Sequence, residues 1–250
     1  MFFVGLLSIC LGLVFGSFIS AYSYRLPKRI SIAKGRSFCP NCKNMIHWFD
    51  NLPLISYLIL GGKCRNCKKH ISLRYPLIEA STSLGFLYIF LNYSYSFPQL
   101  LYYLVIFCLL ILIFVIDLEH QIIPDSLIYS GIIVSFIFFL FTSNLNLLFP
   151  SVFAGFIAAA LLMSIHLLTR GRGMGLGDVK FAVLGGMLVG LNLTLIWLFL
   201  SFLTGGITGT ILILGRRAGL KDQIAFGPFL VIGIILTFLY GEGLLRLLGF

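Results

Sequence analysis

A long run without any ionisable side chain constrains this fold more than any other feature. From Ala80 to Ile116 the chain has no Asp, Glu, Lys, Arg or His, and uncharged runs recur over 126–165 and 181–215. Shorter ones extend over 1–24 and 223–241. One helical crossing of a bilayer needs roughly 20 apolar residues. The longer runs are therefore long enough for two crossings each, and the shorter ones for one.

Polar breaks near 92–98, 142–150 and 191–194 divide each long run into a helical hairpin. With 59% apolar and 10% charged residues, the composition excludes an ordinary soluble domain. The sequence predicts an all-α polytopic membrane protein with about eight transmembrane helices. The first run has no basic region before it, so we expect it to stay in the protein rather than act as a cleaved signal peptide.

The basic residues predict the orientation. The net charge is +10, and eleven of the 18 Lys and Arg residues lie between Arg25 and Arg74. Because each long run is a hairpin, the charged loops between the runs all lie on one side of the membrane; they are 25–79, 117–125, 170–180 and 216–222. The positive-inside rule assigns this side to the cytoplasm. Both termini are expected on the far side. Since topology accounts for the charge, we expect membrane lipid as a partner and no nucleic acid.

Two aspartates stand at the cytoplasmic ends of predicted spans, in a chain with only 8 acidic residues. Asp117 closes an apolar run at a helix C-terminus, where the helix dipole disfavours an anion. Asp178 opens a span of only about 14 residues. Carboxylates at membrane depth usually face the bundle interior and mark function. The alternatives without a functional role are that Asp117 is a solvated residue at a helix end and that Asp178 marks the end of a loop.

Paired aspartates supply the chemistry of peptide hydrolysis. One, ionised, takes a proton from water, while the other, protonated, donates to the carbonyl oxygen and then to the leaving amine. We expect Asp117 and Asp178 to form this pair, because both lie at the same depth on the same side. Asp125, which follows Pro124, is expected to cap the next helix and is the alternative to Asp117.

Four cysteines predict a metal centre. Cys39, Cys42, Cys64 and Cys67 form two C-x2-C knuckles with 21 residues between them, a spacing that suits tetrahedral Zn²⁺ held by four thiolates. Disulfides are not expected in the reducing cytoplasm. Two redox pairs and an alternative ligand such as His47 or His70 are the other readings. Because all four positions are filled by protein, the zinc is expected to be structural.

These features divide the chain into three parts. Residues 1–24 form the first transmembrane helix, residues 25–76 a small cytoplasmic zinc-binding domain with four cysteine ligands, and residues 77–250 a transmembrane aspartyl protease core.

The chain resembles the bacterial type IV prepilin leader peptidases from end to end. The shared motifs are Gly16-Ser-Phe18, Arg25-Leu-Pro27, the two cysteine knuckles, Asn51-Leu-Pro53, Ser56-Tyr57, Gly62-Lys-Cys-Arg65, Tyr75-Pro-Leu-Ile-Glu79, Asp117, Ile123-Pro-Asp125, Gly175-Leu-Gly-Asp-Val-Lys180 and Phe226-Gly-Pro-Phe229.

The resemblance implies a membrane enzyme of the bacterial inner membrane, with its active site facing the cytoplasm. Such enzymes cut the leader from prepilins and pseudopilins, for pili or for secretion, and many methylate the new N-terminus with S-adenosylmethionine. It places the catalytic pair at Asp117 and Asp178, and supporting groups at Gly175, Gly177, Lys180 and Asp125. The substrate-binding carboxylate would be Glu79, and the zinc ligands the four cysteines above.

Methyl transfer is implied by the resemblance alone, and we expect it in the 25–76 loop because this is the only sizeable cytoplasmic segment. The alternative function is a zinc-stabilised membrane transporter or scaffold with an intramembrane carboxylate pair. It predicts an inverted repeat of broken helices, and the two halves show no convincing symmetry.

Overall fold

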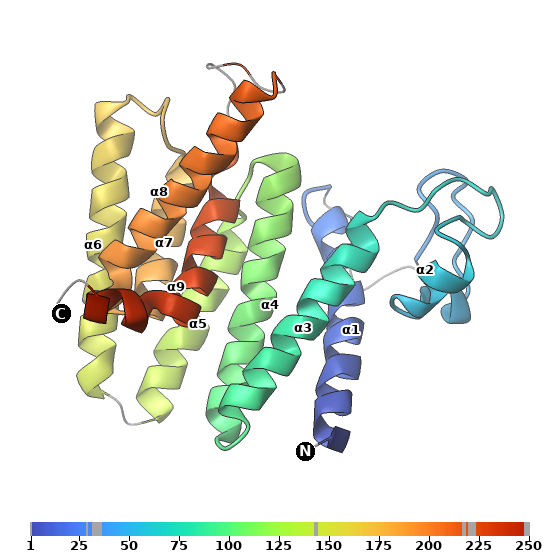
Figure 1. Ribbon diagram of the computed structural model, residues 1–250, viewed down its shortest axis with the longest axis horizontal. Helices are drawn as coiled ribbons and strands as arrows, with labels where there is room; N and C mark the ends of the chain where they lie inside the picture. The colour runs from blue at the N-terminus through green and yellow to red at the C-terminus, as the bar shows by residue number, and fades with distance from the viewer. Residues whose placement is uncertain are drawn as a thin grey trace. The chain divides into compact units, whose positions relative to one another are not determined.

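The computed structural model describes residues 2–28, 30–31, 37–142, 145–216, 219 and 224–247. Within these residues the fold is all-helical, as predicted (Figure 1). It contains isolated β-bridges but no β-strand. The helices are α1 (Phe2–Arg25), the 3-10 helix η1 (Trp48–Asn51), α2 (Ile55–Ile59), α3 (Arg74–Tyr93), α4 (Phe97–His120), α5 (Asp125–Phe141), α6 (Leu145–Leu168), α7 (Leu176–Val189), α8 (Leu191–Leu214) and α9 (Gly227–Leu247).

Helices occupy all the predicted runs, and among the described residues five helices are long and apolar enough to cross a membrane. These are α1, α4, α6, α8 and α9. The other three, α3, α5 and α7, have 20, 17 and 14 residues. This pattern is that of a multi-pass membrane protein, while the number of eight crossings stays a prediction.

One break is shorter than predicted. The sequence suggests that 142–150 is irregular, but α6 already begins at Leu145 and Pro150 lies inside it. Pro150 is the sixth residue of α6 and removes only one backbone hydrogen bond there, so the helix still begins upstream of it. Gly190, with a φ of +80°, makes the sharp turn between α7 and α8. The charged loop at 216–222 lies mostly outside the described residues.

The chain forms two compact units, Met1–Leu112 and Ile113–Phe250. In the first, α1 packs along α3 (Figure 1), and glycines of α1 lie at the contact. A Cβ added at Gly12 would lie 2.5 Å from Cα of Ser83, and one added at Gly16 would lie 2.7 Å from Cα of Glu79. Only glycine permits this approach of two helix backbones. It holds Glu79 close against α1.

In the second unit α7 is the central helix and packs against α5, α6, α8 and α9. Gly186 of α7 meets the backbone of α6, where an added Cβ would lie 2.6 Å from the carbonyl oxygen of Ala154. The indole N–H of Trp197 on α8 donates to the carbonyl oxygen of Leu230 on α9 at 2.9 Å. The first contact holds the C-terminal half of α7 against α6, and the second joins α8 to α9.

Candidate functional site

Asp178 lies in the first turn of α7 and is 8% exposed. Its Oδ2 accepts the backbone N–H of Gly175, the N-cap residue, at 3.1 Å. The loop before it is held by His166, whose Nδ1 lies 2.7 Å from the carbonyl oxygen of Met174. A helix N-terminus stabilises a carboxylate through its free N–H groups and its dipole. The glycine-rich motif therefore folds so as to hold a buried anion.

Asp117 lies in the last turn of α4 and is 4% exposed. Its own helix end is unfavourable for an anion, yet Oδ2 accepts the N–H of Gly227, the first residue of α9, at 2.9 Å. The positive end of α9 thus offsets the negative end of α4. A Cβ added at Gly227 would lie 2.5 Å from Oδ2 of Asp117, so the hydrogen bond depends on glycine at this position.

Ile123 connects the surroundings of the two aspartates. A Cβ added at Gly227, beside Asp117, would lie 3.0 Å from Cδ1 of Ile123. One added at Gly177, beside Asp178, would lie 3.4 Å from Cβ of the same isoleucine. Both predicted aspartates are therefore buried in the second unit, and Ile123 lies beside the glycine next to each of them.

Each carboxylate uses only one oxygen in the hydrogen bond that fixes it. Oδ2 is the acceptor in Asp117 and in Asp178. The second oxygen of each can accept a proton or hold a water molecule. A carboxylate with one oxygen left over in this way can act as a general acid or a general base.

Asp125 has a different environment from Asp117. It is the first residue of α5, and its carboxylate makes no helix cap. Both of its oxygens bind Nζ of Lys180 on α7, at 2.9 and 2.8 Å. The two side chains are 49% and 44% exposed. The expected capping role is wrong, since the carboxylate forms an exposed ion pair that joins α5 to the helix of Asp178.

The four predicted metal ligands are brought together in the first unit. The Sγ atoms of Cys39, Cys42, Cys64 and Cys67 all lie within 4.8 Å of one another. Those of Cys39 and Cys67 are 3.9 Å apart. Zn–S bonds of about 2.3 Å in a tetrahedron require sulfur atoms about 3.8 Å apart. The four-cysteine set therefore fits a structural zinc ion. His70 lies outside the cluster, as does His47, which stacks on Phe49.

The two knuckles have the same backbone structure. The N–H of Cys39 donates to the carbonyl oxygen of Asn44 and the N–H of Cys64 to that of Lys69, both at 2.9 Å. The residue after each second cysteine, Lys43 and Lys68, has φ near +60°. Backbone N–H groups of Cys67 and Asn66 lower the pKa of the Cys64 thiol to about 7. Such donors favour the thiolate that a metal requires.

An ion pair ties η1 to the second knuckle. Arg65 donates to both carboxylate oxygens of Asp50, at 2.8 and 2.7 Å. The guanidinium holds the pKa of the Asp50 carboxyl below its ordinary value. Asp50 is thus neutralised by a cation of its own domain.

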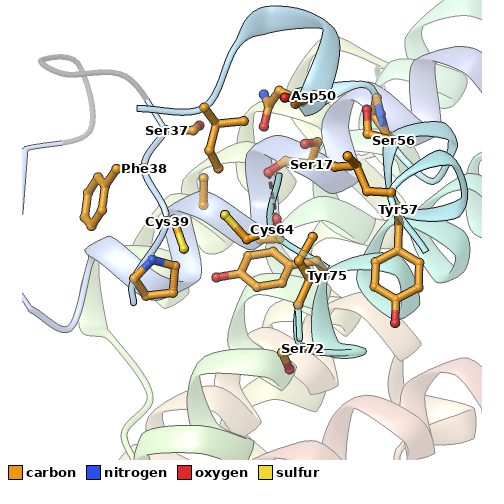
Figure 2. Close-up of a pocket in the computed structure, with 18 of the residues that line it drawn as sticks. Ser17, Ser37, Phe38, Cys39, Asp50, Ser56, Tyr57, Cys64, Ser72 and Tyr75 are labelled. Carbon is orange, nitrogen blue, oxygen red and sulfur yellow. Dashed lines mark hydrogen bonds between the residues drawn. The ribbon is translucent and has the colours of Figure 1, made fainter. Parts of the chain in front are cut away.

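Glu79 lies on α3 and is 7% exposed. It accepts the backbone N–H of Leu54 at 2.9 Å and a hydrogen bond from Ser17. Leu54 precedes α2 and has a φ of +57°, so the carboxylate supports a strained turn. Beside it is a cavity of about 750 Å³, bounded by α1, the knuckles, α2 and the start of α3. Figure 2 shows Ser17, Tyr57, Cys64 and Tyr75 around this space.

Sequence reasoning did not assign a role to Gly227 or to Ile123. Both stand in the motifs Phe226-Gly-Pro-Phe229 and Ile123-Pro-Asp125, which the family resemblance had already drawn attention to. A glycine followed by proline at the start of a span was the available signal. Its partner Asp117 is 110 residues away, and nothing local in the sequence connects the two.

Two family models match the chain. Bacterial Peptidase A24 N-terminal domain matches residues 10–93, and Type IV leader peptidase family matches residues 104–210. The first match contains the four cysteines and Glu79, and the second contains Asp117 and Asp178.

Curated relatives match along nearly the whole chain. The prepilin leader peptidase/N-methyltransferase of Pseudomonas aeruginosa is 32% identical over 96% of this chain and 92% of its own length. The protein of the same name from Bacillus subtilis is 31% identical over 94% of this chain and 93% of its own. That from Legionella pneumophila is 33% identical over 87% and 77%. No solved structure matches significantly.

Proposed function

Because this chain belongs to the type IV leader peptidase family, we propose that it removes the leader peptide of type IV prepilins and pseudopilins. The enzyme works in the bacterial inner membrane, at its cytoplasmic face. The basic loops, which the positive-inside rule assigns to the cytoplasm, support this orientation. The apolar helix of the substrate shares the bilayer with the enzyme, which brings the scissile bond to the interface.

Cleavage is carried out by Asp117 and Asp178, and the observation that carries this proposal is their common burial beside Ile123. The ionised member takes a proton from water, which attacks the scissile carbonyl. The protonated member donates to the carbonyl oxygen and later to the leaving amine. Gly175 and Gly227 hold the two carboxylates through their N–H groups. The carboxylates are thus oriented before substrate arrives.

The Lys180–Asp125 pair supports this site from outside. It bridges α7 and α5 and keeps one further carboxylate neutralised near the α7 N-terminus. Zn²⁺ held by the four cysteines stabilises the N-terminal domain and takes no part in hydrolysis, because its four positions are filled by thiolates.

The second proposed activity is N-methylation of the new N-terminal residue with S-adenosylmethionine. It is supported by the names of the relatives, which pair the two activities in one protein. The amine released by hydrolysis is the acceptor. A donor with a positively charged methyl-sulfonium group supplies the methyl.

The experiment incubates the detergent-solubilised full chain with a prepilin, with and without S-adenosylmethionine, and measures the product by mass spectrometry. We expect loss of the leader in both conditions and one added methyl mass only with the donor. Asp178→Asn serves as the matched inactive chain. An unchanged prepilin in the wild-type reaction would refute the proposal.

A further inference from the structure

One peptide group connects His166 to Asp178. Its carbonyl oxygen, which belongs to Met174, lies 2.7 Å from Nδ1 of His166. Its N–H, which belongs to Gly175, donates to Oδ2 of Asp178 at 3.1 Å. The carbonyl and the N–H of a trans peptide lie in one rigid plane and point in opposite directions. Whatever holds the carbonyl therefore also directs the N–H toward the carboxylate, and here it is the histidine ring.

The same contact determines which ring nitrogen of His166 carries a proton. A backbone carbonyl oxygen only accepts hydrogen bonds, so Nδ1 must be the donor. The neutral ring is then the tautomer with its proton on Nδ1. Polarising a carbonyl makes the N–H of the same peptide group a stronger donor, so hydrogen bonds in such a chain strengthen one another. The ring thus supports the hydrogen bond that caps Asp178.

The link between α6 and α7 closes around this ring. The N–H of Gly171 donates to the backbone carbonyl oxygen of His166 at 2.8 Å, and Gly171 has a φ of +76°. A Cβ added at Gly171 would lie 3.3 Å from Cε1 of the ring. Three residues later, the buried Met174 meets Nδ1. The ring is therefore packed between two parts of the link, which limits its rotation.

A second side chain braces the same link at a different peptide group. Oγ1 of Thr169 accepts the N–H of Gly173 at 3.1 Å. A Cβ added at Gly173 would lie 2.9 Å from Cγ2 of Thr169, so the two residues are in close contact. This hydrogen bond stabilises the turn but acts on Gly173, not on the peptide group that caps Asp178. It offers an internal comparison for the role of His166.

We propose that His166 is a positioning residue for hydrolysis, which acts through the Met174–Gly175 peptide group to orient the carboxylate of Asp178. The inference rests on the proposed cleavage by Asp117 and Asp178, and it adds a side chain from the last turn of α6 to that site. Because the ring acts on the carboxylate and not on the substrate, its loss lowers kcat and leaves KM nearly unchanged.

The test measures kcat and KM of leader cleavage by the full chain in detergent, from initial rates with a prepilin, for His166→Leu and His166→Asn. Leucine removes the donor. The amide nitrogen of asparagine, like Nδ1, is bonded to Cγ and donates. We expect His166→Leu to lower kcat about 5-fold or more, and His166→Asn to recover most of that loss. A wild-type kcat in His166→Leu, or an equal loss in both variants, would overturn the proposal.

Thr169→Val is the matched control in the same link. Valine keeps the branched shape of threonine and removes the acceptor of the Gly173 N–H. We expect it to change kcat less than His166→Leu does, because the peptide group that caps Asp178 keeps its partner. Equal losses of kcat in the two variants would show that any loosening of the link has the same effect, and would overturn a specific role of the ring.

Nitrogen-15 NMR tests the contact without any substrate. In histidine-labelled chain at alkaline pH, where an imidazole ring is neutral, the signals absent from His166→Asn are those of His166. We expect the proton on Nδ1, and a shift of the Nδ1 resonance in Asp178→Asn, because one peptide group joins the two side chains. A proton on Nε2 alone, or an unchanged resonance, would overturn the inference.

The NMR result and leader cleavage separate this inference from the proposed peptidase. A wild-type chain that shows both NMR features but leaves prepilin intact contradicts only the peptidase. A wild-type chain that cleaves prepilin while His166→Leu cleaves it with the same kcat contradicts only the role of His166.

Discussion

The backbone N–H of Gly227 donates to Oδ2 of Asp117 at 2.9 Å, which sets the start of α9 against the end of α4. The dipole of α4 disfavours an anion at its C-terminus, where Asp117 lies. The N-terminus of α9 stabilises the buried carboxylate instead, through this one contact. It also makes a glycine far along the chain part of the candidate active site.

Substituting Gly227 with alanine should impair cleavage. The added Cβ would lie 2.5 Å from Oδ2 of Asp117, so the carboxylate must move and lose its N–H donor. The loss of such a hydrogen bond costs roughly 1–3 kcal/mol, or about 5- to 150-fold in rate. Initial rates of leader removal measure it. Gly206→Ala is the control, since a Cβ there meets no atom within 4 Å. Equal rates in both variants would contradict the role of Gly227.

The exposed ion pair of Lys180 and Asp125 should matter much less. Pairs of this exposure contribute about 0–1 kcal/mol, and neither side chain is buried. We expect Asp125→Asn and Lys180→Gln each to keep cleavage within about 5-fold of the wild type. A complete loss of activity in Asp125→Asn would make Asp125, rather than Asp117, the first catalytic aspartate.

Zinc content tests the four-cysteine centre. Purified wild-type chain should contain one zinc ion per chain by elemental analysis, and Cys64→Ser should lose most of it because a hydroxyl is a poor zinc ligand. Cys108→Ser alters a cysteine of α4 that lies outside the cluster and should retain the metal. Equal zinc in both serine variants would refute the assignment.

Close packing of α1 on α3 predicts a stability effect at Gly16. An added Cβ would lie 2.7 Å from Cα of Glu79, and backbone atoms cannot yield as a side chain can. We expect Gly16→Ala to lower the unfolding free energy by roughly 1–3 kcal/mol, seen as a lower midpoint of thermal unfolding in detergent. Gly5→Ala, whose Cβ would lie 3.7 Å from a side-chain atom of Leu87, should leave that midpoint unchanged.

Helix positions could be predicted from the sequence because apolar runs and their polar breaks are local features. The short α7 was expected from the spacing of Asp178 and Asn192, and it has 14 residues. The start of α6 at Leu145 differs from the predicted break at 142–150, because polar residues and Pro150 indicate a break although the helix continues through them.

Contacts between distant segments could not be predicted in this way. The cysteines are an exception, because the spacing of two C-x2-C pairs is typical of one metal site and so predicts that the four side chains lie together. Nothing comparable pairs Gly227 with Asp117, or Leu54 with Glu79, since a backbone N–H leaves no signature in the side-chain pattern. The cavity beside Glu79 likewise depends on how α1, α2 and the knuckles pack.

The most direct test of the paired carboxylates is leader cleavage by Asp117→Asn and Asp178→Asn, each compared with the wild type in detergent and assayed by mass spectrometry. Asparagine keeps the size of the side chain and removes its acid and base function. We expect each variant to remain inserted and folded and to lose cleavage by roughly 100-fold or more. Cleavage near the wild-type rate in either one would contradict a mechanism that depends on both aspartates.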